Sequence, residues 1–77
     1  MIVEFSTHDQ DSLKKISALF SSRNFIISSY EMEDRTDGSG NPIHYVTMVV
    51  KAKNMNEEGV LLMLLHDFSE ITVHRII

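Results

Sequence analysis

Four short stretches of the chain are rich in β-branched and aromatic residues. Such stretches are typical of half-buried β-strands, in which successive side chains point to opposite faces of a sheet. They predict strands at residues 2–6, 25–32, 43–51 and 71–76. Residues 37–42 read Asp-Gly-Ser-Gly-Asn-Pro, so we expect a hairpin loop over residues 35–42 between the second and third strands.

Two other segments space their apolar residues by three and four positions, as one face of a helix does. The first face is formed by Leu13, Ile16, Ser17 and Phe20. The second face is formed by Val60, Leu61, Leu64, Leu65 and Phe68. Residues 54–57, Asn-Met-Asn-Glu, resemble a capping box and predict where the second helix starts.

The first helix has two alternative starts. Thr7 with Gln10, or Asp9 with Ser12, would place a capping side chain just before the apolar face. Asn24 tolerates the left-handed conformation that ends many helices, and we expect it to stop this one.

The predicted elements follow the order β-α-β-β-α-β within a single domain, residues 1–77. Right-handed crossovers place both helices on the same face of an antiparallel sheet. The chain is therefore predicted to be an α+β protein of ferredoxin-like arrangement. In this arrangement a four-stranded antiparallel sheet carries two helices on one face.

Alternation along the strands assigns residues to the two faces of the sheet. The face toward the helices is expected to hold Val3, Phe5, Phe25, Ile27, Val46, Met48, Val50, Ile71 and Val73. The other face is expected to hold Ile2, Ile26, Tyr30, Met32, Tyr45, Thr47, Val49 and Ile76. A slip of one residue would exchange the faces. Since the second face is very apolar for a solvated surface, we expect a second copy of the chain or a neighbouring domain to cover that face or an edge.

Composition narrows the classes of function. A core built from 77 residues supplies only ~3–5 kcal/mol of net stability. Cysteine is absent, so disulfides cannot add to that stability and oligomerisation is the natural aid. The net charge is −4 and the basic residues are scattered, which argues against nucleic acid as a partner. With no signal peptide or membrane-spanning run in the sequence, we expect a cytoplasmic protein or the cytoplasmic part of a membrane protein.

The sequence offers no recognisable catalytic constellation, metal site or cofactor motif. The four histidines lack the close spacing of metal ligands, which favours ordinary polar roles for His8, His44, His66 and His74. Four carboxylates lie near the predicted hairpin, namely Glu31, Glu33, Asp34 and Asp37. They favour a solvated strand edge, with a cation site as the alternative.

Residues 19–29 read Leu-Phe-Ser-Ser-Arg-Asn-Phe-Ile-Ile-Ser-Ser. This run resembles the signature Leu-Phe-Ser-x-Arg-Gly-Tyr-Asn-Ile-x-Ser of ACT domains, especially those of acetolactate synthase regulatory subunits. The last predicted strand resembles the end of that family as well. The resemblance implies a non-catalytic regulatory domain that forms a homodimer and senses a small-molecule effector.

The family binds amino acids near its first loop and second strand. The resemblance therefore makes His8, Asp9, Gln10, Asp11 and Ile26 the candidate ligand-binding residues. Asp11 stands where the family has a glycine, and Ile26 stands where it has an asparagine. The glycine before that asparagine aligns with Asn24. Because a carboxylate at position 11 would repel an amino acid's carboxylate, we expect a degenerate effector site.

A second resemblance rests on layout alone. The soluble C-terminal domains of MgtC/SapB-type membrane proteins are ACT-like as well, with the same order of elements and a degenerate effector site. This resemblance implies an interaction module without a small ligand.

Overall fold

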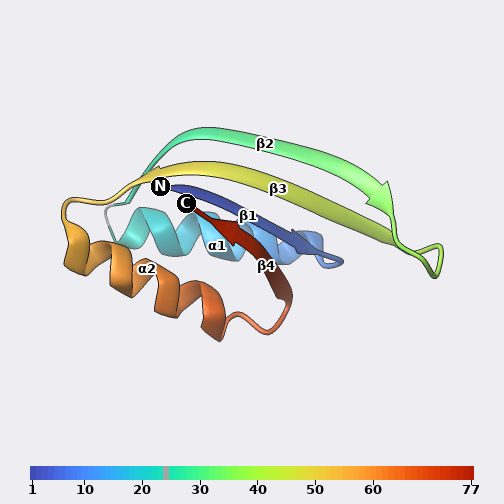
Figure 1. The fold of residues 1–77 in the computed structure, drawn as a ribbon. Helices are drawn as coiled ribbons and strands as arrows, with labels where there is room; N and C mark the ends of the chain where they lie inside the picture. Colours follow the sequence, from blue (N-terminus) through green and yellow to red (C-terminus); the bar gives the residue numbers. More distant parts are fainter. Residues whose placement is uncertain (24) are drawn as a thin grey trace.

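The computed structural model describes residues 1–23 and 25–77. Six elements follow one another in the predicted order (Figure 1). The strands are β1 (Ile2–Thr7), β2 (Ile26–Thr36), β3 (Pro42–Lys51) and β4 (Ile71–Ile76). The helices are α1 (Gln10–Ser22) and α2 (Met55–Asp67).

The strands form one antiparallel sheet in the order β2-β3-β1-β4, so β2 and β4 are its edges. Both helices lie on the same side of this sheet (Figure 1). The predicted α+β, ferredoxin-like arrangement is therefore confirmed. The two ends of the described chain meet on neighbouring strands, where Ile2 and Ile77 exchange two backbone hydrogen bonds of 2.9 Å.

Both helices begin at a capping side chain. Asp9 precedes α1, and its carboxylate accepts hydrogen bonds from the backbone N–H of Asp11 at 3.0 Å and the hydroxyl of Ser12 at 3.4 Å. Of the two predicted starts, the structure uses the second. Asn54 caps α2 and accepts the backbone N–H of Glu57 at 3.0 Å, as predicted.

The β2–β3 hairpin is longer than the sequence predicts. β2 extends four residues past its predicted end, and the loop shrinks to residues 37–41. The Asp37 carboxylate accepts the backbone N–H groups of Ser39 and Asn41 at 2.9 Å each. Gly40 adopts a φ of 83°, a conformation that favours glycine. The tip of the hairpin consequently extends beyond the helices (Figure 1).

The core lies between the sheet and the two helices. Its buried apolar side chains are Val3, Phe5, Leu13, Ile16, Phe20, Phe25, Val46, Met48, Val50, Leu61 and Leu65. Ile27, Ile71 and Val73 pack against this cluster while half-buried. The residues assigned to the helix-facing side of the sheet are thus confirmed. Asn24, the expected stop of the first helix, lies outside the described residues.

Two β-bulges correct part of the face assignment. In β2, Ile27 pairs with Val50 but Ser29 pairs with Val49, so Ser28 is an extra residue. Beyond this bulge, Tyr30 pairs with Met48, and paired residues share a face. Tyr30 and, two residues later, Met32 therefore lie on the helix side of the sheet and not on the open side.

The second bulge lies in β4, which pairs with β1. Val73 pairs with Phe5, but Arg75 pairs with Glu4, so His74 between them is an extra residue. Ile76 consequently pairs with Val3 and packs against the core, which also corrects its predicted place on the open side.

Candidate functional site

The predicted ligand-binding residues lie at the two opposite ends of the sheet. His8, Asp9, Gln10 and Asp11 follow β1, where Thr7 pairs with His44. Ile26 begins β2 at the other end of the sheet, where it pairs with Lys51. Seven residues of β3 separate those partners, or about 23 Å at ~3.3 Å per residue. Within one chain, Ile26 therefore cannot share a ligand with the other four residues.

The start of α1 already holds a carboxylate. Asp9 occupies the backbone N–H of Asp11, and its own backbone carbonyl accepts the N–H of Ser12 at 3.1 Å. A helix start attracts anions because its first N–H groups lack partners within the helix. Here a side chain of the chain itself takes that role, and the carboxylate of Asp11 stands exposed beside it.

The predicted acidic group near the hairpin divides between the two faces of the sheet. His44 Nδ1 lies 2.6 Å from Asp34 Oδ1, and His8 Nε2 lies 2.8 Å from Asp37 Oδ2. Glu31 and Glu33 face the open side, where they pair with Thr47 and Tyr45. Across residues 1–23 and 25–77, no three histidine or carboxylate side chains converge on a possible metal position.

The open side of the sheet divides into an apolar and a polar half. At one end, three apolar residues lie next to one another: Ile77 directly after β4, Ile2 on β1 and Val49 on β3. We call these three residues the apolar row. Ile26 lies beyond them, with 63% of its surface exposed.

The adjacent row is charged. Arg75, Glu4, Thr47 and Glu31 follow one another across β4, β1, β3 and β2, and we call these four residues the charged row. In this row the single cation lies on β4, and the two carboxylates lie on β1 and β2. The described part of the chain places no helix over this side (Figure 1).

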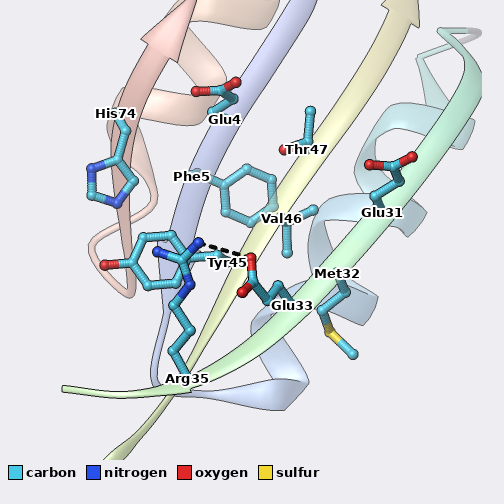
Figure 2. A pocket seen from close by; sticks show the side chains of 10 residues that line it. All are labelled: Glu4, Phe5, Glu31, Met32, Glu33, Arg35, Tyr45, Val46, Thr47 and His74. Carbon is cyan, nitrogen blue, oxygen red and sulfur yellow. Dashed lines mark hydrogen bonds and ion pairs between the residues drawn. The ribbon is translucent and has the colours of Figure 1, made fainter.

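A cavity of about 390 Å³ opens on the polar half (Figure 2). Its lining comprises Glu4, Phe5, Glu31, Met32, Glu33, Arg35, Tyr45, Val46, Thr47 and His74. All four strands contribute to it, so it depends on the whole sheet being assembled.

A stack of planar side chains crosses this cavity (Figure 2). The Arg35 guanidinium carbon lies 4.6 Å from the centre of the Tyr45 ring, within cation–π range. The His74 ring stacks on Tyr45 with centroids 5.5 Å apart and planes inclined by 15°. His74 Nε2 also lies 2.7 Å from the hydroxyl of Ser6, which fixes the ring. Alternation after Val73 places His74 on this side, and the bulge in β4 then keeps Arg75 on the same side.

Arg35 also pairs with a carboxylate. Its guanidinium nitrogen lies 2.8 Å from Glu33 Oε2 (Figure 2). The hydrogen bond from Arg35, followed by its positive charge, lowers the pKa of the Glu33 carboxyl. The same contact raises the pKa of Arg35. Glu33 therefore stays ionised and Arg35 is held over Tyr45.

The hydrogen bond between Ser6 and His74 does not build a nucleophile. Ser6 is only 3% exposed, so a substrate carbonyl has no approach to its hydroxyl. A serine nucleophile also needs an oxyanion hole and a group that orients the histidine. The contact instead holds the His74 ring against Tyr45. The cavity can therefore contact a ligand or partner through its charged and planar side chains.

Sequence reasoning missed this cavity as a site. Tyr45 and Thr47 were expected on the open side, but Arg35 was assigned to a loop and His74 to an ordinary strand position. The stack joins residues from three strands that lie far apart in the sequence. The only local signal is the alternation of Tyr45 and Thr47 in the third strand.

No family model and no curated protein sequence matches this chain. The resemblances to ACT domains and to the domains of MgtC/SapB-type proteins therefore remain predictions. No helix among the described residues is long and apolar enough to cross a membrane.

Proposed function

We propose that this chain is a non-catalytic regulatory domain that acts by associating with a second copy of itself. The observation that carries the proposal is the open side of the sheet. The helices cover one side, whereas the other side presents the apolar row and a polar cavity to solvent. A 77-residue domain gains stability when such a side is covered by a second copy.

Like the ACT domains that the sequence resembles, the domain is proposed to regulate by associating with a second copy. Unlike them, it is proposed to do so without binding an amino acid. Asp9 fills the start of α1, and Asp11 adds a second carboxylate beside it. Both features favour a degenerate amino-acid site. The domain then regulates through association itself, without a bound amino acid at this position.

Two measurements on the whole chain test the proposal. Analytical ultracentrifugation across a concentration series should show a reversible monomer–dimer equilibrium in the absence of any ligand. A thermal-shift screen of the twenty amino acids should show no large stabilisation. An amino acid at 100 times its Kd would add about 2.7 kcal/mol to the free energy of unfolding.

The two parts of the proposal fail separately. A chain that stays monomeric at high micromolar concentration would contradict the association. A clear stabilisation by one amino acid would contradict the regulation without a bound effector.

A further inference from the structure

We propose that two copies of this chain pack face to face through the open side of the sheet, about a twofold axis parallel to the strands. The inference rests on the proposed function and specifies which surface associates and in which orientation. In this dimer, β4 of one copy lies over β2 of the other, and β1 lies over β3. Sheets that pack face to face keep their strands within about 30° of parallel, which suits such an axis.

The open side is charge-balanced, unlike the rest of the molecule. Its charged side chains are three carboxylates and three cations, namely Glu4, Glu31, Glu33, Arg35, Lys51 and Arg75. The whole chain has a net charge of −4, so the surplus of acid lies on the other surfaces. Two copies approaching through those surfaces repel each other, whereas the open side carries no net charge.

Within the charged row, the single cation lies at one edge of the sheet and a carboxylate lies at the other. The charged row begins with Arg75 on β4 and ends with Glu31 on β2. A twofold axis parallel to the strands reverses this row, so that Arg75 of one copy faces Glu31 of the second copy. The operation creates this pair twice, because a twofold interface uses each contact in both directions.

The other twofold axis in the plane of the interface runs across the strands. It would place β4 over β4, so that Arg75 would face a strand that contains the same arginine and no carboxylate. Like charges in contact suppress association. The distribution of charge therefore selects the axis parallel to the strands.

The apolar row fits the same arrangement. Reversal of this row places Ile2 over Val49 of the second copy, and Ile77 over Ser29 on the β2 edge. Ile26 lies three residues from Ser29 on the same edge. Ile2, Ile26 and Ile77 are 37%, 63% and 60% exposed in the isolated chain. Their burial supplies an apolar contribution beside the ion pairs.

Both members of the proposed ion pair are available for it. The ion pairs of the described residues involve neither Arg75 nor Glu31. Four strands spaced by ~4.8 Å and six residues long at ~3.3 Å each give a face of roughly 19 by 20 Å. With the relief of its side chains, such a face approaches the ~600 Å² per partner of the smallest stable interfaces.

Charge reversal tests this geometry by sedimentation equilibrium. The single variants Glu31→Arg and Arg75→Glu should each raise the dimer Kd by about tenfold or more, since each disrupts two equivalent pairs. The double variant with both changes restores opposite charges and should return the Kd to near the wild-type value. Lys15→Glu, on an exposed position of α1, is the matched control and should leave the Kd unchanged.

A cross-linking experiment supports the same test without relying on affinity. The chain has no cysteine, so Glu31→Cys and Arg75→Cys each introduce a single thiol. A short bis-maleimide should cross-link the mixture of the two variants and give little product with either variant alone. Circular dichroism confirms that each variant is folded.

The outcomes separate this inference from the proposed function. Dimers that tolerate both single reversals, or mixtures that do not cross-link, would overturn the face-to-face geometry while leaving self-association intact. A wild-type chain that remains monomeric at high micromolar concentration would overturn both. Rescue by the double variant establishes the contact between Glu31 and Arg75.

Discussion

The His8 side chain reaches the tip of the β2–β3 hairpin, where its Nε2 atom lies 2.8 Å from Oδ2 of Asp37. This contact joins the loop after β1 to a turn 29 residues later in the chain. The same Asp37 carboxylate holds the turn through the N–H groups of Ser39 and Asn41. One carboxylate thus organises the hairpin loop and fixes its position against the start of α1.

Replacement of the Asp37 carboxylate should remove one contribution to the pH dependence of the protein's stability. The hydrogen bond from Asn41, followed by that from His8, lowers the pKa of Asp37 below its ordinary value of 3.8. A group with a lowered pKa in the folded state stabilises the fold above its unfolded pKa, and this effect is lost as the pH falls through the folded pKa. Asp37→Asn should therefore lower the Tm at pH 7, and the difference from the wild type should shrink below pH 3.8.

Thermal melts from pH 2 to pH 8 provide the measurement. His8→Ala is the comparison: it removes only one of the contacts that lower the Asp37 pKa and leaves the turn intact, so its effect on the pH dependence of Tm should be smaller than that of Asp37→Asn. A Tm difference between wild type and Asp37→Asn that stays constant over this range would contradict the assignment.

The two glycines of the hairpin loop should respond differently to the same substitution. Gly40 has a φ of 83°, and an added Cβ is strained there, so Gly40→Ala should cost about 1 kcal/mol of unfolding free energy. Gly38 has no positive φ and no atom within 4 Å of an added Cβ, so Gly38→Ala should be neutral or slightly stabilising. Urea denaturation of both variants measures the difference, and equal losses would argue against the turn as described.

The contact between α2 and the sheet should depend on its buried face alone. Leu61 is fully buried, so Leu61→Ala should cost about 2–5 kcal/mol through lost contacts and a cavity. That loss is comparable with the ~3–5 kcal/mol expected for so small a core, and the variant should be largely unfolded. Met63 on the same helix is 69% exposed, and Met63→Ala should change little. Far-ultraviolet circular dichroism with urea titration distinguishes the two, and comparable losses would contradict the orientation of the helix.

Asn54 should contribute as the cap of α2. Its side chain accepts the backbone N–H of Glu57, so Asn54→Ala should lose about 1 kcal/mol of unfolding free energy. Asn56 lies in the first turn with its side chain exposed, and Asn56→Ala should be neutral or stabilising because alanine favours the helix. Chemical denaturation of the pair tests this prediction, which a neutral Asn54→Ala would refute.

The elements of this fold could be predicted because their signals are local. The spacing of Leu13, Ile16 and Phe20 identifies a helix face within eight residues, and the capping sequence from Asn54 to Glu57 identifies a helix start within four. The faces of β1 and β3 could be predicted throughout, but those of β2 and β4 only as far as the bulge in each strand. The alternation of apolar and polar residues does not reveal that Ser28 and His74 are extra residues. Each bulge reverses the sheet face of the residues that follow it in the strand.

The cavity of the open side was harder to predict for a related reason. Arg35, Tyr45 and His74 meet only because β2, β3 and β4 assemble in one sheet. The first-loop candidates, His8 to Asp11, are contiguous and were easier to see, yet Asp9 uses its carboxylate to cap its own helix. Local patterns thus identified the scaffold, whereas the charged surface depends on long-range register.

The hydrogen bonds between Ile2 and Ile77 have a consequence for how the chain can be reconnected. Because both ends of the fold lie on neighbouring strands, a short peptide can join them without disturbing the sheet. The exposed hairpin loop at residues 38–40 then offers a place for new ends, since loop tips tolerate such cuts. The resulting circular permutant would keep every strand neighbour of the original order, and the same geometry suits this domain for insertion into a loop of a host protein.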